Sequence, residues 1–157
     1  ISYEQRLRAL YLEAIPEITS EAGKMFFRAM AAEEQEHYEI LVRMLKSHEV
    51  AGELPPHSLE TSPFHLALTK ASLRKVKKLM KTCENFADKG EVAFLKKAHA
   101  IERETSSFYE QLIDRVEPQF RDLFASFLRI EREHERFIDF QLNMIAITGS
   151  FYEGIVA

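Results

Sequence analysis

Residues 31–41 read AAEEQEHYEIL, a run of helix-forming residues that carries a carboxylate and an imidazole on one face. Glu34 and His37 are three residues apart, so both side chains project from the same side of a helix. The residues that extend this face are all apolar: Phe27, Met30, Leu41 and Met44. The pattern predicts a helix that buries these two polar groups within its apolar stripe.

The same pattern recurs almost one hundred residues later, in FLRIEREHERFIDF at residues 127–140. Glu131 and His134 are again three residues apart and lie on an apolar face. That face extends through Phe120, Phe124, Phe127, Ile138 and Leu142. A single Glu-x-x-His arises by chance in a chain with this much glutamate. Two copies, each within an apolar stripe, indicate a shared purpose.

Two further helical segments each place one carboxylate in an apolar stripe, and each carboxylate is followed by a tyrosine. Glu4 precedes Tyr11 by seven residues, which is two turns along one face. Glu102 precedes Tyr109 by the same interval. From these carboxylates the Glu-x-x-His motif follows after 30 residues in the first half and 29 in the second. The chain therefore reads as two copies of one helical hairpin.

The chain is predicted to be all-α, since no segment shows the two-residue alternation of a half-buried strand. The predicted helices span about residues 2–15, 20–48, 63–83, 90–117 and 118–148. With 157 residues the chain fits one domain, in which hairpins at about 1–48 and 88–148 flank an inserted loop and helix at about 49–87.

Composition excludes several classes of protein. The formal net charge of -4 and the pI of about 5.9 provide no basic field for nucleic acid. Cys83 is the only cysteine, which excludes an intramolecular disulfide and a cysteine-based metal site and favours a reducing, cytoplasmic setting. No apolar run approaches 18 residues, so no membrane-spanning segment is expected.

The inserted helix, at about residues 64–83, combines an apolar stripe with a dense basic face. The favoured interpretation is a helix that packs on the bundle and exposes its lysines to solvent. The alternative is a docking surface for an acidic partner or an anion.

Four carboxylates in the seam of a bundle repel one another and lose their hydration, at a cost on the order of several kcal/mol each. A pair of divalent or trivalent cations compensates for that cost. Oxygen-rich sites with one imidazole per metal suit iron or manganese better than structural zinc. The pattern thus predicts a dinuclear metal site, as in di-iron carboxylate bundles.

The chain resembles the ferritin-like superfamily, and specifically its rubrerythrin-type branch, over about residues 1–48 and 88–148. The stretch AIERETSSFYEQL at residues 100–112 is particularly close to that family. The resemblance implies a ferritin-like four-helix bundle, with the inserted helix in its central connection, that binds two iron ions. The implied roles are metal-bridging carboxylates for Glu34 and Glu131, terminal ligands for Glu4 and Glu102, one nitrogen ligand each from His37 and His134, and hydrogen bonds to ligand carboxylates from Tyr11 and Tyr109.

The activity implied by the resemblance is redox chemistry, in which two ferrous ions reduce peroxide or dioxygen. Two departures from the family bear on that expectation. Thr105 stands where rubrerythrins carry an additional glutamate. That glutamate takes part in the redox-linked ligand exchange of their peroxidase cycle, so the same exchange is not implied for this chain. A rubredoxin domain needs four cysteines, so electrons would come from a separate donor protein. The resemblance also implies a homodimer.

The sequence leaves several assignments open. A helix rotated by one position would bury Glu33 or Glu133, Gln5 competes with Glu4 for its place, and His99 lies three residues before Glu102. The ligand set also suits manganese. The rival functions are iron storage or delivery, and a metal-free helical interaction module that uses the basic helix.

Overall fold

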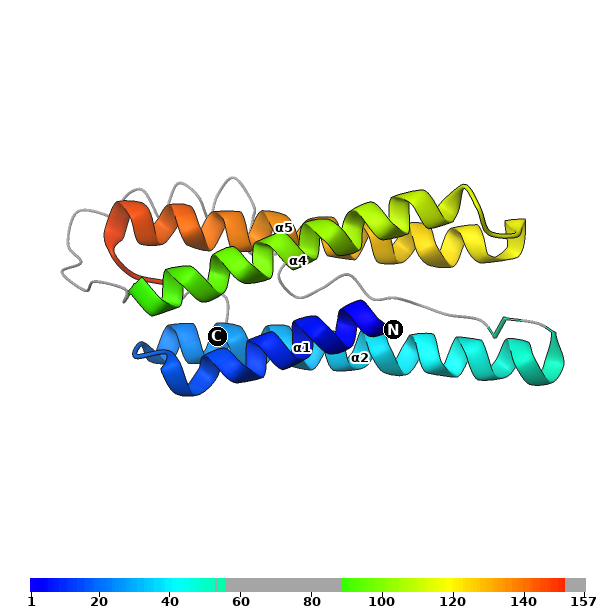
Figure 1. The fold of residues 1–157 in the computed structure, drawn as a ribbon, viewed down its shortest axis with the longest axis horizontal. Helices are drawn as coiled ribbons and strands as arrows, with labels where there is room; N and C mark the ends of the chain where they lie inside the picture. The colour runs from blue at the N-terminus through cyan, green and yellow to red at the C-terminus, as the bar shows by residue number, and fades with distance from the viewer. Residues whose placement is uncertain (53, 56–88, 152–157) are drawn as a thin grey trace.

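The computed structural model describes residues 1–52, 54–55 and 89–151. Within these ranges, four α-helices form two hairpins that lie side by side (Figure 1): α1 (Ser2–Ala14) with α2 (Glu21–Ala51), and α4 (Lys89–Ile113) with α5 (Pro118–Thr148). No strand occurs within the described ranges, so the prediction of an all-α bundle is confirmed. The predicted basic helix at about 64–83 and Cys83 lie outside the described residues.

The ends of the helices follow from local backbone chemistry. Helix α1 ends at Ala14, one residue before the predicted end, and a 3-10 turn at Ile15–Glu17 accommodates the proline at its second position. The Ser20 hydroxyl accepts a hydrogen bond from the Gly23 amide at 3.0 Å and so caps α2.

Two glycines end the long helices. Gly52 and Gly149 adopt the left-handed conformation, with φ of 70° and 75° respectively. The end predicted for α5 at residue 148 is therefore confirmed. The end predicted for α2 at residue 48 is wrong, because the helix continues to Ala51 and only the glycine beyond it reverses the chain.

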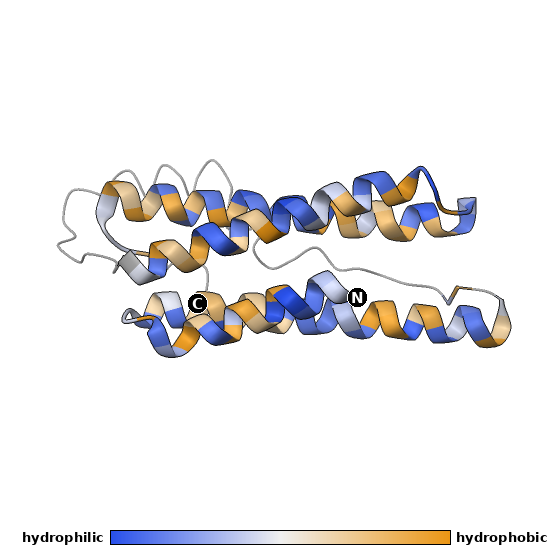
Figure 2. Ribbon diagram, in the orientation of Figure 1, coloured by the Kyte–Doolittle hydropathy of each residue, from blue (hydrophilic) through white to orange (hydrophobic). Residues whose placement is uncertain are grey.

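The interior contains two apolar clusters with a polar layer between them. Helix α1 packs against α2 and α4, and α4 packs against α5. Hydrophobic and hydrophilic residues alternate along each described helix (Figure 2), as expected for helices with one apolar face. The first cluster includes Met30, Ala98 and Phe137, and the second includes Ile40, Tyr109 and Phe127. On α2, α4 and α5 alike, the predicted ligands fall in sequence between these two sets.

A buried carboxylate links the two hairpins at the first turn of α4. Glu91 is fully buried, and its Oε1 accepts hydrogen bonds from the Thr19 and Ser20 amides, each at 3.0 Å, and from the Thr19 hydroxyl at 3.3 Å. Backbone amides just before α2 have no partner within their own helix. Glu91 supplies that partner from the other hairpin, so it fixes how the hairpins dock.

Glu91→Gln is expected to lower the free energy of unfolding by about 1–3 kcal/mol, because a charged acceptor for three donors becomes a neutral one. The metal content should not change, since Glu91 lies outside the polar layer. Urea denaturation with elemental analysis of the same samples would test both expectations. A loss of metal in Glu91→Gln would contradict this assignment of a purely structural role.

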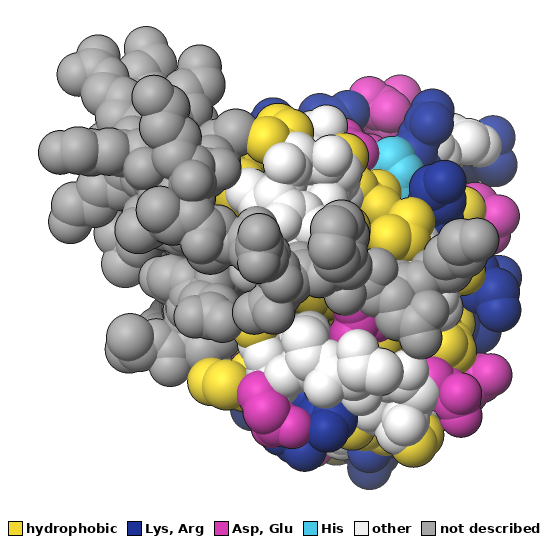
Figure 3. All heavy atoms as spheres, turned by 90° about the vertical axis from the view of Figure 1, so that its left-hand side faces the viewer, with side chains coloured by type: hydrophobic (Ala, Val, Ile, Leu, Met, Phe, Trp, Pro, Cys, Tyr) yellow, Lys and Arg dark blue, Asp and Glu magenta, His cyan; other side chains and the backbone are white. Residues whose placement is uncertain are grey.

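The outer surface carries charges of both signs. At the end of the molecule drawn in Figure 3, basic and acidic side chains are interspersed around the described helices rather than segregated by sign. Among the described helices, none combines the length and the apolar character that crossing a membrane requires.

Candidate metal centre

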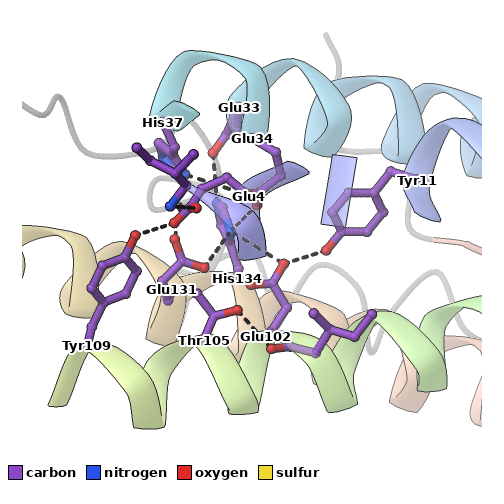
Figure 4. Close-up of polar contacts among 12 residues, drawn as sticks. Glu4, Tyr11, Glu33, Glu34, His37, Glu102, Thr105, Tyr109, Glu131 and His134 are labelled. Atoms are coloured by element: carbon purple, nitrogen blue, oxygen red, sulfur yellow. Dashed lines mark hydrogen bonds and ion pairs between the residues drawn. The ribbon is translucent and has the colours of Figure 1, made fainter. Parts of the chain in front are cut away.

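The polar layer consists of side chains from all four helices, which converge on one point in the seam between the hairpins (Figure 4). All eight residues that the sequence predicted for the site are buried: Glu4, Tyr11, Glu34, His37, Glu102, Tyr109, Glu131 and His134. Six of them have no exposed surface, and His37, the most exposed, retains only 6 %. Glutamate is rarely buried to this extent without a partner.

One end of the layer is a compact group of four potential ligands. Nδ1 of His134 lies 3.1 Å from Glu34 Oε1, 3.5 Å from Glu102 Oε1 and 3.9 Å from Glu131 Oε2. One ligand atom from each of these four residues lies within 4.8 Å of every other. This spacing, with three carboxylates and one imidazole, suits a single cation bound among them.

The two central carboxylates also reach the second imidazole. Nδ1 of His37 lies 3.6 Å from Glu34 Oε2 and 3.6 Å from Glu131 Oε1. Each carboxylate thus presents one oxygen to His37 and its other oxygen to His134. The two imidazole rings are stacked, with their centroids 5.5 Å apart. Oxygen and imidazole donors grouped in this way could hold a metal ion.

The tyrosines hold the outer carboxylates across the seam. The Tyr11 hydroxyl on α1 donates a hydrogen bond to Oε1 of Glu102 on α4, at 2.5 Å. The Tyr109 hydroxyl on α4 donates in return to Oε1 of Glu4 on α1. Each tyrosine therefore orients a carboxylate of the other hairpin and not of its own.

Glu4 lies at the far end of the layer from the compact group. Its Oε2 is 2.6 Å from the amino group of Ile1. The structure does not bring Glu4 into the group of four formed by His134 and the other three carboxylates. Its burial and its bond from Tyr109 nevertheless direct it toward the layer, on the side of His37 (Figure 4).

Several buried oxygen and nitrogen atoms in the layer have no hydrogen-bond partner within the described residues. Both carboxylate oxygens of Glu34, both of Glu131 and Oε2 of Glu102 belong to this set, as do the Nδ1 atoms of both histidines. Buried polar groups in native proteins are almost always paired. Each oxygen of Glu34 and Glu131 lies within 3.9 Å of one of the two Nδ1 atoms, and cations bound among these atoms would satisfy them together. The donor set therefore fits a hard or borderline metal ion.

Burial and the neighbouring charges shift the protonation of these groups. Burial, followed by the charges of Glu34 and Glu102, raises the pKa of Glu131 well above its ordinary value. Burial also acts to raise the pKa of Glu34, but the adjacent imidazoles of His134 and His37 outweigh it and lower that pKa. Burial and the neighbouring carboxylates raise the pKa of Tyr11 and of Tyr109, so both hydroxyls stay protonated and act as donors.

One residue of the site was not assigned from the sequence. Glu33 is 14 % exposed, and its Oε2 lies 3.0 Å from Nε2 of His134. The helical pattern predicted Glu33 only in place of Glu34, on a rotated helix, whereas the structure points both inward. The sequence does show two adjacent glutamates, Glu33 and Glu34. Only the structure shows that Glu33 contacts His134 of the other hairpin.

The remaining candidate residues fall outside the layer. Gln5 is exposed, and Glu133 is buried but does not belong to the group of four around His134. His99 is partly exposed and pairs with Asp139 at 3.1 Å. The Thr105 hydroxyl donates to the Ile101 carbonyl at 2.9 Å. The Thr105 hydroxyl therefore bonds within α4 and not to the carboxylates of the layer.

Comparison with known proteins adds no assignment to this geometry. No family model, no curated protein and no solved structure matches the chain.

Proposed function

We propose that this protein is a dinuclear non-haem iron protein of the rubrerythrin-like type, which reduces peroxide or dioxygen. The observation that carries the proposal is the position of Glu34 and Glu131, each with one oxygen toward His37 and the other toward His134. A site for one cation needs no such duplication. Two carboxylates shared between two imidazoles support a pair of metals.

Charge supports the same number of ions. Four carboxylates of the layer have no exposed surface, those of Glu4, Glu34, Glu102 and Glu131, and the charge of two divalent cations would neutralise these four. Imidazole and carboxylate ligands suit iron and manganese, and the described residues place no thiolate in the layer that would favour zinc. We take iron as the first candidate because the sequence pattern resembles di-iron proteins.

When bound, two ferrous ions supply the two electrons that, with two protons, convert hydrogen peroxide into two water molecules. The residues of the chain hold the reacting positions in place. Glu34 and Glu131 would hold both ions, and the tyrosine hydroxyls, which bond Glu102 and Glu4, would keep these two carboxylates oriented as ligands. The apolar clusters on either side keep bulk water away from the layer. A separate protein would return the electrons.

The test is an anaerobic titration of metal-free protein with ferrous iron, followed by addition of hydrogen peroxide in a single turnover. We expect two irons bound per chain and one peroxide consumed per two irons oxidised, measured by elemental analysis and by the absorbance of the ferric product. Storage or delivery of iron would instead show loading beyond two irons per chain. A protein that binds no metal after reconstitution would exclude the proposal.

A further inference from the structure

The two halves of the metal centre differ at one position. Glu34 and His37 in the first half correspond to Glu131 and His134 in the second, 97 residues later in both cases. The residue before Glu34 is Glu33, whereas the residue at the equivalent place in the second half is Ile130, which is 2 % exposed. The repeat therefore carries one additional carboxylate on one side only.

That carboxylate acts across the seam on the histidine of the other hairpin. Glu33 Oε2 lies 3.0 Å from Nε2 of His134, while Nδ1 of His134 faces Glu34 and Glu102. A cation bound by Nδ1 leaves the ring proton on Nε2, so Nε2 donates to Glu33. His134 therefore has the Glu33 carboxylate at Nε2 and the candidate ligands Glu34 and Glu102 at Nδ1.

His37 has a different environment. Ile130, which takes the place of Glu33 in the second half, cannot accept a hydrogen bond. The His37 ring packs against Phe127 in a T-shaped arrangement, with the ring centroids 5.6 Å apart. A histidine whose second nitrogen donates to a carboxylate is a more basic and better oriented metal ligand. The two histidines therefore differ in strength as ligands, although they match in sequence.

We propose that Glu33 is a positioning residue that makes the two metal sites unequal, so that the site at His134 binds its cation first and more tightly. This inference rests on the proposed dinuclear centre and adds an order of filling to it. Glu33 is also the most exposed carboxylate of the group, at 14 %, so it lies between the buried layer and solvent. Its Oε2 contacts Nε2 of His134, and Glu33 is not one of the four residues grouped around Nδ1 of that histidine.

The experiment is a stepwise titration of metal-free protein with Co²⁺, which reports coordination by its visible absorbance without undergoing oxidation. The variant is Glu33→Gln, which keeps the shape of the side chain and removes its charge. The matched control is Glu36→Gln, the same change at an exposed position of the same helix. Circular dichroism of each protein checks that the helices are intact.

We expect wild type and Glu36→Gln to bind the first Co²⁺ more tightly than two identical sites would. In Glu33→Gln the affinity of the first site should fall by about 10- to 100-fold while that of the second changes by less than about threefold. Solvent exchange of the paramagnetically shifted ring N–H of His134 should also accelerate. A purely structural role would lower both affinities together.

Three results would overturn the inference while leaving the dinuclear centre intact. They are two Co²⁺ bound with the same stepwise affinities in Glu33→Gln as in wild type, an equal loss at both sites, and a third Co²⁺ in wild type that Glu33→Gln alone loses. The last would make Glu33 a ligand, since Glu33, His37 and His134 also lie close enough to hold an ion. Absence of any Co²⁺ binding in wild type would instead refute the proposed function.

Discussion

Glu131→Gln is expected to abolish binding of both cations and, at the same time, to make the metal-free protein more stable. The carboxylate contacts both histidines, so neither site is complete without it. In the absence of metal it is a fully buried group that Glu34 and Glu102 repel, as its raised pKa indicates. A glutamine of the same shape removes that repulsion, and we expect a gain of about 1–4 kcal/mol in the free energy of unfolding.

Urea denaturation at pH 8 in the presence of a chelator would measure the gain, and elemental analysis after reconstitution would measure the loss of metal. The matched control is Glu133→Gln, a buried glutamate two residues away on the same helix that belongs to neither candidate group. It should retain two metals per chain. If Glu131→Gln lowered the stability of the metal-free protein, then Glu131 would serve the fold through contacts within the chain and not the metal.

The metal-free protein is expected to lose stability as the pH rises from about 5 to 8, and bound metal should reverse this trend. Burial and the charges of Glu34 and Glu102 raise the pKa of Glu131 above the ordinary 4.5. Burial acts to lower the pKa of His134, but Glu102, Glu33 and Glu34 outweigh it and raise that pKa above 6.5. A group with a raised pKa in the folded state holds its proton more tightly there than in the unfolded chain. Its stabilising effect is complete below the unfolded pKa and disappears as the pH rises through the folded value.

The pKa of Glu34 shifts in the opposite direction, and its effect on stability changes only below the range of pH 5 to 8. Its lowered pKa stabilises the fold above 4.5, and that contribution disappears only in more acidic solution. Between pH 5 and 8 the two raised groups therefore determine the slope.

Cation binding opposes this loss of stability with rising pH. A cation binds Glu131 and His134 only when they have released their protons, so binding becomes stronger as the pH rises. At a free metal concentration about 1,000 times the dissociation constant, binding adds about 4 kcal/mol to the stability of the fold. Melting temperatures measured between pH 5 and 8, with a chelator and with Mn²⁺, should diverge as the pH rises. Parallel curves would show that the ionised layer holds no cation.

Much of the fold was predictable because the signals are local. Pro118 and Gly149 mark the ends of α5 in the sequence as they do in the structure. The apolar stripe of α1, from Glu4 to Ala14, coincides with the face that the structure buries. Helical periodicity predicts which face of each helix points inward, and all eight predicted site residues are buried.

What the sequence could not provide depends on contacts between distant segments. Nothing near Glu91 indicates that it caps a helix 70 residues earlier, and the tyrosines gave no sign that each would bond the other hairpin's carboxylate. Glu33 illustrates the limit most clearly. Adjacent helical residues differ by about 100° in direction, so one of a Glu-Glu pair is expected to face outward. Here the seam is wide enough to receive both.

The crossed tyrosine bonds and shared carboxylates also bear on how the molecule opens. Hairpins often behave as separate cooperative units, each able to unfold while the rest stays folded. A cation bound by Glu34 and His134 belongs to both hairpins, so neither can separate without releasing it. Amide hydrogen exchange in the metal-free protein would then resolve two protection levels, one for each hairpin. In the loaded protein the two levels would merge, because any opening that frees one hairpin has become the unfolding of the whole.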